Sequence, residues 1–86
     1  MEEIHQTCRN LKEEAQARYT FPDPKVKNDS GLAINAFDEL EHAAWGPSFK
    51  RQKFEKARQT ALKIVSMIGD HEYRKQIEKQ IQNLNL

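Results

Sequence analysis

The sequence predicts an all-α fold: four helices in a single domain, arranged as a compact four-helix bundle or as two packed helix hairpins. Apolar residues recur every three or four positions over four separate stretches, as on one face of an amphipathic helix. Charged residues make up 31% of the chain and apolar residues 37%, which suits helices with one buried stripe and solvated outer faces. Valine and isoleucine are few, which disfavours a sheet-rich fold.

The first helix is expected over residues 2–19. Its apolar stripe repeats at intervals of three or four residues and consists of Ile4, Cys8, Leu11, Ala15 and Tyr19. Cys8 is the only cysteine in the chain, so no internal disulfide can form. Its position on the stripe indicates a small, buried apolar side chain.

Residues 20–30 are expected to form an irregular connection that contains two prolines. Pro22 and Pro24 each lack an amide hydrogen, and each restricts the backbone of the residue before it. Two apolar residues of this connection, Phe21 and Val26, are predicted to fold back over the core, because a wholly solvated loop would not need them.

A second helix is expected over residues 31–45, with Asp29 or Ser30 as its N-cap. One side of this helix carries most of its apolar residues, which are Leu32, Ala33, Ala36, Phe37, Leu40, Ala43 and Ala44. Ile34 and Trp45 point in another direction. We therefore expect this helix either to be covered from two directions or to offer a second apolar patch to a partner.

Gly46 and Pro47 are expected to end the second helix, since glycine accepts a left-handed turn and proline cannot continue a helix. Ser48 is then placed to cap a third helix over residues 49–68. The apolar residues of this helix are Phe49, Phe54, Ala57, Ala61, Ile64, Val65 and Ile68.

Gly69 is expected to end the third helix, and Asp70 to cap a fourth helix over residues 71–84. The stripe of this helix consists of Tyr73, Ile77, Ile81 and Leu84. The connections between the last three helices span two or three residues, so we expect consecutive helices to pack as close neighbours.

Trp45 is the only tryptophan in the chain and directly precedes Gly46. At such a corner an indole can cover the junction between two helices and donate its N–H to a free carbonyl at a helix end, which is the favoured interpretation. In the alternative interpretation, Trp45, Ile34 and Phe49 form an exposed anchor for another protein.

The net charge of +1 is unevenly distributed. Residues 1–45 contain nine acids and five bases, a net charge of −4, whereas residues 46–86 contain nine bases and four acids, a net charge of +5. The stretch from Lys50 to Lys63 alone holds six bases and one acid. Such a division of charge can bring the two halves together or orient a partner with an acidic surface.

Two Glu-x-x-His pairs, Glu2 with His5 and Glu39 with His42, have the spacing found in di-iron carboxylate bundles. The helical phase directs Glu2 and His42 away from the apolar stripes, so neither pair can face the interior of a bundle. His5 and Cys8 have a zinc-like spacing without a second pair of ligands. The sequence also lacks a Gly-rich phosphate loop and a nucleophile motif, so we expect no enzyme, no cofactor and no metal site.

These observations favour a small non-enzymatic protein-interaction module, such as a regulator, an inhibitor or a subunit, with a homodimer among the forms considered. The expected docking surface lies at the corner between the second and third helices and combines apolar and basic side chains: Ile34, Trp45, Phe49, Lys50, Arg51 and Lys53.

The alternative hypothesis is nucleic-acid binding through phosphate contacts of the third helix, made by Lys50, Arg51, Lys53, Lys56 and Arg58. These bases flank both sides of the apolar stripe, as on a solvated helix, which favours protein interaction over nucleic-acid binding. The beginning of the chain does not resemble a signal peptide, and no apolar stretch is long enough to span a bilayer. We therefore expect a cytoplasmic protein without a membrane partner.

Overall fold

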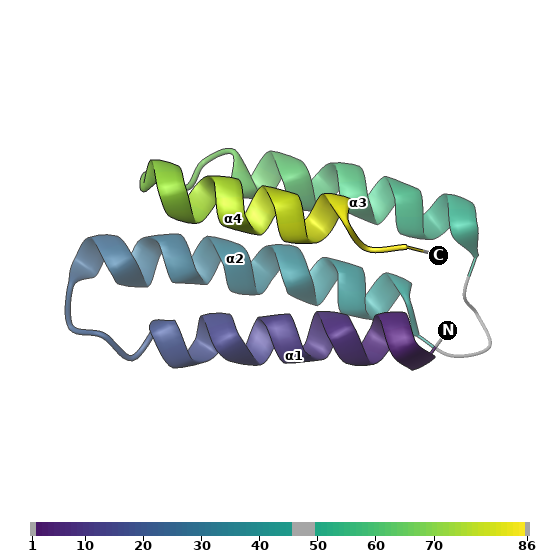
Figure 1. Ribbon diagram of the computed structural model, residues 1–86, viewed down its shortest axis with the longest axis horizontal. Helices are drawn as coiled ribbons and strands as arrows, with labels where there is room; N and C mark the ends of the chain where they lie inside the picture. The colour runs from purple at the N-terminus through teal and green to yellow at the C-terminus, as the bar shows by residue number, and fades with distance from the viewer. Residues whose placement is uncertain (1, 46–49, 86) are drawn as a thin grey trace.

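The computed structural model describes residues 2–45 and 50–85. In this part of the chain it contains four helices: α1 (Glu2–Arg18), α2 (Pro24–Ala43), α3 (Arg51–Val65) and α4 (His71–Gln82). α1 and α2 form one antiparallel hairpin, and α3 and α4 form a second hairpin that lies along it (Figure 1). α2 packs extensively against both α1 and α3, whereas α4 packs less extensively on α3. The predicted all-α, four-helix fold is confirmed.

α2 begins at Pro24, well before the predicted start at residue 31. Asp23 is its N-cap, and the carboxylate of Asp23 accepts a hydrogen bond of 2.8 Å from the amide of Lys25. Proline is compatible with the first turn of a helix, where the amide hydrogen that it lacks would have no partner within the helix. The prediction of an irregular connection over residues 20–30 is therefore wrong beyond residue 23.

The remaining helix ends differ from the predicted ones by a few residues. α1, α2 and α4 end one or two residues earlier than predicted. α3, predicted over residues 49–68, ends three residues early, because the amides of Met67 and Ile68 bond to carbonyls three residues back, as in a tighter 3₁₀ turn. The predicted helix-ending turn and cap over residues 46–49 lie outside the described residues.

The core is built from the apolar stripes of all four helices. Its largest fully buried side chains are Phe37, Phe54, Leu40, Ile68 and Ile81. Burying one such side chain stabilises the fold by roughly 1.5–3 kcal/mol. Much of the remaining α2 surface in the core is alanine, namely Ala33, Ala36 and Ala43, and small side chains let neighbouring helices approach closely. Cys8 is completely buried, as the sequence predicts.

A buried carboxylate joins α2 to the turn between α3 and α4. Asp29, only 6% exposed, accepts hydrogen bonds from the amides of Gly69 (2.9 Å) and Asp70 (3.1 Å). The prediction that Asp29 or Ser30 caps its own helix is wrong, since both lie within α2. Asp70 caps α4 as predicted, because its carboxylate accepts a hydrogen bond of 2.8 Å from the amide of Tyr73.

Arg58 of α3 connects to the end of α4. Its side chain donates hydrogen bonds to the carbonyls of Ile81 (2.5 Å), Leu84 (2.6 Å) and Gln82 (3.3 Å). It also pairs with Glu55 one turn earlier on α3, at 3.2 Å. The last carbonyls of a helix have no partner within the helix, and a cation is favourable at this negative end of the helix dipole. Arg58 thus fixes the end of α4 against α3.

Asp29→Ala is expected to lower the free energy of unfolding by about 2–3 kcal/mol, because two backbone amides lose a charged acceptor. Urea denaturation followed by circular dichroism measures this change. The matched control is Glu39→Ala, which removes an exposed carboxylate from the same helix and should change the free energy by less than about 0.5 kcal/mol. Equal effects of the two substitutions would contradict a special role for Asp29.

The buried thiol should make stability depend on pH in the alkaline range. Burial raises the pKa of Cys8 from 9.0 to about 11, and the negative charge of Glu41 adds to the effect. The unfolded chain therefore releases this proton at a lower pH than the folded protein. The contribution is fully present below pH 9.0 and is lost as pH rises to about 11.

In Cys8→Ala this contribution is absent, so the free energy of unfolding should fall less steeply than in the wild type between pH 9.0 and about 11. Urea titrations of both proteins across this range measure the difference. Lysines and tyrosines that titrate in the same range affect both proteins alike, so the variant is its own background control. If the free energy of unfolding falls equally steeply with pH in both proteins, the alkaline loss of stability does not come from Cys8.

Candidate functional site

Trp45 lies two residues after the end of α2 and is 61% exposed to solvent. Its ring meets the imidazole of His5, on α1, edge to face, with 4.8 Å between ring centroids and an interplanar angle of 63°. The favoured interpretation expected the indole to cover the junction between the second and third helices and close the end of the core, but the indole is mostly open to solvent. The buried residues at this end of α2 are Ala43 and Ala44.

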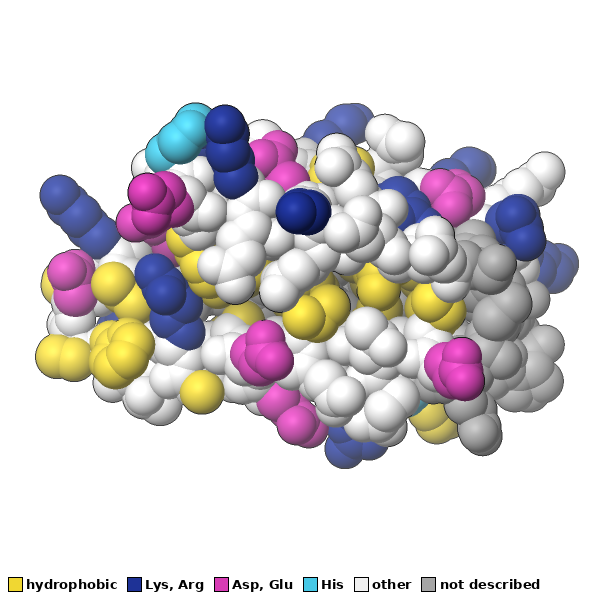
Figure 2. Space-filling view, viewed as in Figure 1, with side chains coloured by type: hydrophobic (Ala, Val, Ile, Leu, Met, Phe, Trp, Pro, Cys, Tyr) yellow, Lys and Arg dark blue, Asp and Glu magenta, His cyan; other side chains and the backbone are white. Residues whose placement is uncertain are grey.

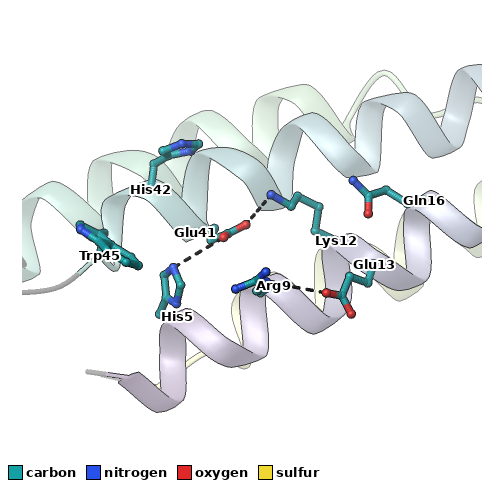
Figure 3. Close-up of a pocket in the computed structure, with 8 residues that line it drawn as sticks. All are labelled: His5, Arg9, Lys12, Glu13, Gln16, Glu41, His42 and Trp45. Atoms are coloured by element: carbon teal, nitrogen blue, oxygen red, sulfur yellow. Dashed lines mark ion pairs between the residues drawn. The ribbon is translucent and has the colours of Figure 1, made fainter.

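A groove with a volume of about 560 Å³ runs between α1 and α2 and ends at Trp45 (Figure 3). Its lining consists mainly of polar and charged side chains from the two helices: His5, Arg9, Lys12, Glu13, Gln16, Glu41, His42 and Trp45. Below, "the Trp45 groove" means this set of residues. The exposed indole is the large apolar side chain among otherwise polar ones, so the groove offers an aromatic contact at one end and charges along its length.

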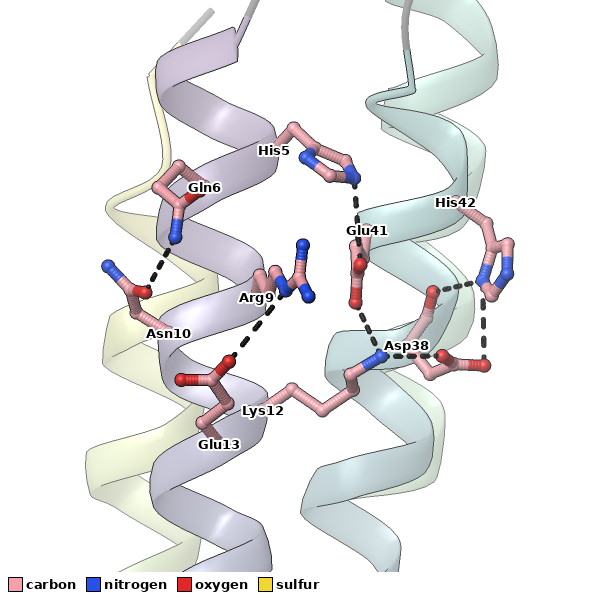
Figure 4. Close-up of polar contacts among 9 residues, drawn as sticks. All are labelled: His5, Gln6, Arg9, Asn10, Lys12, Glu13, Asp38, Glu41 and His42. Atoms are coloured by element: carbon pink, nitrogen blue, oxygen red, sulfur yellow. Dashed lines mark hydrogen bonds and ion pairs between the residues drawn. The ribbon is translucent and has the colours of Figure 1, made fainter.

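Ion pairs between the two helices form one wall of the Trp45 groove (Figure 4). Lys12 Nζ lies 2.5 Å from Glu41 Oε1 and 3.2 Å from Asp38 Oδ1. On its other side, Glu41 Oε2 lies 3.5 Å from His5 Nε2. The side chains of Lys12 and Glu41 are mostly buried, and the hydrogen bond to Glu41 raises the pKa of Lys12. These pairs therefore hold α1 against α2 and are part of the framework of the groove.

The remaining charges of the groove are exposed. Arg9 Nε lies 3.7 Å from Glu13 Oε1, and both side chains are more than half exposed. His42 contacts Asp38 one turn earlier on α2, at 2.8 Å from the backbone carbonyl, but its side chain is 77% exposed. Exposed pairs of this kind contribute roughly 0–1 kcal/mol, so a partner can replace them at little cost. Arg9 and His42 are thus the polar groups most accessible to a partner.

The groove does not bring metal ligands together. Within residues 2–45 and 50–85, no group of three or more His, Cys, Asp or Glu side chains is arranged to hold a metal ion. His42 points outward, as its helical phase predicts, and Cys8 is buried in the core.

The predicted anchor is only partly assembled in the structure. Ile34 is half-buried against the core, and it lies eleven positions before Trp45, about 16 Å along a helix axis. Its place in the predicted docking surface beside the indole stays a prediction. Phe49 lies outside the described residues. Lys50, Arg51 and Lys53 are exposed at the start of α3.

The predicted nucleic-acid face loses one of its five bases. Lys50, Arg51, Lys53 and Lys56 are exposed, but the Arg58 side chain is only 12% exposed and is held by the carbonyls at the end of α4. Its use as a phosphate contact is therefore corrected. The other four bases belong to a helix whose buried stripe they flank, as on any solvated helix.

Sequence reasoning missed the α1 side of the groove. His5, Arg9, Lys12 and Gln16 follow one another at intervals of four, three and four residues, so they form a polar stripe beside the apolar one. This spacing was available in the sequence and places the four side chains on one face. Their position opposite Glu41 depends on how α1 packs on α2, which the spacing does not specify.

No protein-family model, curated protein or solved structure matches this chain. Of the four described helices, none combines the length and the apolar character that crossing a membrane requires. The functional assignment therefore depends on the residues of the site itself.

The fluorescence of Trp45 should report an exposed indole. Because this is the only tryptophan, we expect an emission maximum close to that of the urea-unfolded protein and efficient quenching by acrylamide. His5→Ala removes the ring that contacts the indole, so quenching should become at least as efficient. A blue-shifted emission that acrylamide does not quench would show that the indole is buried in solution.

Proposed function

We propose that this protein is a non-enzymatic protein-interaction module that binds an acidic surface of a partner protein. The docking surface combines the Trp45 groove with the cations at the start of α3, Lys50, Arg51 and Lys53. The observation that carries the proposal is the exposure of Trp45, 61%, at the end of a groove. Among the described residues, only three other large apolar side chains are exposed.

An exposed tryptophan suits an anchor for a partner. Tryptophan is enriched among the residues that contribute most to protein–protein binding, because a rigid ring buries a large apolar area with little loss of conformational entropy. The indole of Trp45 already rests edge-on against His5, so part of its orientation is fixed before binding. A partner side chain can cover the exposed part of the ring.

The charges near Trp45 favour an acidic partner. The first turn of α3 contains no acidic residue, and its three bases lie at the positive end of the helix dipole. In the isolated protein these bases repel one another and interact unfavourably with the helix dipole. Carboxylates of a partner would relieve both unfavourable interactions, which favours binding. Exposed bases also raise the association rate with an acidic surface.

The buried thiol supports the non-enzymatic part of the proposal. Cys8 is completely buried and its pKa is raised to about 11, so at neutral pH it is a protonated thiol rather than a nucleophilic thiolate. His5 contacts Glu41 and Trp45, and both contacts fit a role in shaping the groove.

Affinity capture from a nuclease-treated lysate of the native source tests the proposal. The wild type should retain one or more proteins, and Trp45→Ala should retain them at least about tenfold less, as expected when an anchor is lost. Replacing Lys50, Arg51 and Lys53 together with glutamine should weaken the same interaction and its salt dependence. The matched control is Gln59→Ala, which shortens an exposed side chain of α3 outside the proposed docking surface.

Capture of the same proteins in equal amount by wild type and Trp45→Ala would refute the proposal. Sedimentation of the purified protein tests self-association. A dimer that Trp45→Ala dissociates would show that the surface binds a second copy of the chain. Retention that disappears only after nuclease treatment would instead favour nucleic-acid binding.

A further inference from the structure

A row of basic and uncharged polar side chains lies on the side of α3 that faces away from the core. The core side of this helix is defined by its buried residues, which follow one another every three or four positions: Phe54, Ala57, Ala61 and Val65. On the opposite side, exposed side chains follow at intervals of four, three and four residues: Gln52, Lys56, Gln59 and Lys63. Two more exposed residues, Lys53 and Thr60, lie at one edge of this row. Below, "the α3 outer stripe" means these six residues.

The lysines of the α3 outer stripe have no acidic partner within the described part of the chain. No ion pair there includes Lys53, Lys56 or Lys63. Glu55, the only acid of α3, lies at the other edge of the stripe, and its carboxylate pairs with Arg58 at 3.2 Å. In Figure 2, basic side chains gather along the upper right edge of the molecule, where α3 runs in Figure 1. Because α3 holds five bases and this one acid, the charge that it presents to solvent is mainly positive.

The end of the bundle where the α1–α2 and α3–α4 connections lie differs from the α3 outer stripe, because it carries both signs of charge (Figure 1). Its exposed apolar side chains lie in the connections: Tyr19, Phe21 and Met67. Phe21 is 55% exposed, so the prediction that it folds back over the core is wrong. Acids and bases are both exposed at this end, namely Asp23, Asp70, Lys25 and Lys27. This end therefore does not favour a partner of one charge.

The composition of the α3 outer stripe argues against a protein or a membrane as its partner. Protein interfaces are depleted of lysine and depend on a few anchors, chiefly Trp, Tyr and Arg, and the stripe contains none of these. A helix that binds a membrane surface inserts apolar side chains, whereas the buried apolar side chains of α3 face the core. A polyanion needs neither feature.

The side chains of the α3 outer stripe are of the kinds that contact phosphate oxygens in nucleic-acid complexes. Lysine ammonium, glutamine amide and threonine hydroxyl groups all donate hydrogen bonds to phosphate. Lys56 and Lys63 are two turns apart on α3, about 10 Å along the helix axis. That length corresponds to about three consecutive phosphates of one duplex strand, at roughly 3.4 Å each. A row of donors on one helix therefore matches a continuous phosphate backbone.

We propose that the α3 outer stripe binds the phosphate backbone of a nucleic-acid duplex without reading its base sequence. The lysines neutralise phosphates and release the counterions bound to them, and Gln52, Gln59 and Thr60 donate hydrogen bonds to phosphate oxygens. The set differs from the bases expected from the sequence, because Arg58 is held by the end of α4, whereas Lys63 is exposed on the stripe. The proposal goes beyond the protein partner of the Trp45 groove and requires neither the indole nor that partner.

Fluorescence anisotropy of labelled duplexes tests the proposal. One duplex is DNA and the other is RNA of the same sequence, and each is titrated with the purified protein at increasing concentrations of KCl. We expect binding at low salt. The logarithm of the association constant for DNA should fall by about 2.7 per tenfold increase in salt, as expected for about three phosphate contacts. Binding of either duplex supports the proposal, and the stronger binding shows which backbone geometry the stripe prefers.

Combining Lys56→Gln with Lys63→Gln removes two of these contacts. The salt dependence should become shallower by about 1.8, and binding at low salt should weaken at least about tenfold. The matched control combines Lys25→Gln with Lys27→Gln, which removes the same charge from exposed positions of α2 and should leave the salt dependence unchanged. Trp45→Ala should also bind the duplex as the wild type does, so failure of the function proposed for the Trp45 groove and failure of this proposal are separate results.

The proposal is overturned if neither duplex binds at low salt. It is also overturned if the two double variants weaken binding equally, since binding would then depend on net charge alone. Displacement of the labelled duplex by polyglutamate as effectively as by unlabelled duplex would assign the stripe to acidic proteins instead. Sedimentation with phosphatidylserine vesicles, without duplex binding, would assign it to a membrane surface. The substituted lysines are exposed, so the variants should fold, which circular dichroism checks.

Discussion

The buried carboxylate of Asp29 fixes the relation between the two helix hairpins. It accepts hydrogen bonds from amides forty and forty-one residues later in the chain, and so attaches the α3–α4 turn to α2. A buried carboxylate is stable only when its charge is compensated, and here two N–H groups just before α4 provide the compensation. Arg58 has the complementary role at the other end of α4, where it binds carbonyls. Both ends of the shortest helix are thus held by charged side chains, which compensates for its smaller packing area.

The first hairpin is held in a different way, and this difference produces the groove. α1 and α2 share an apolar seam, but beside it Lys12, Glu41 and His5 meet across the helices. Polar side chains of this length keep the helix edges apart where alanines would let them close. The indole of Trp45 lies at the open end of this seam, next to His5, whereas the two alanines before it, Ala43 and Ala44, are buried.

Features that follow from helical periodicity were predicted correctly from the sequence. Features that required a choice between competing local signals, such as several possible caps, were not. The Asp70 cap and most of the four apolar stripes were correctly predicted, because each is a property of residues close together in the chain. Tyr19, predicted on the first stripe, is instead 47% exposed beyond the end of α1, and Phe49 lies outside the described residues. The start of α2 was predicted wrongly, because Asp23, Asp29 and Ser30 are all good capping residues. Only the tertiary contact with Gly69 shows that the Asp29 carboxylate binds another turn of the chain instead of capping its own helix. Phe21 was expected to fold back over the core and Trp45 to cover a helix junction, but both side chains are more than half exposed. The exposure of the predicted docking bases of α3 follows from their phase on that helix, which the sequence gives. The surroundings of Ile34 depend on how the helices pack, which the sequence does not give.

The burial of Cys8 also makes the molecule convenient for spectroscopy. As it is the only cysteine and its thiol is protected by the core, a cysteine introduced at an exposed site, for example by Lys27→Cys, can be labelled with a dye without a second reaction. Lys27 is near the start of α2 and Trp45 lies two residues beyond its end, so the length of one helix separates the dye from a natural donor. Energy transfer between them would report directly on whether α2 stays straight and intact when the Trp45 groove is occupied.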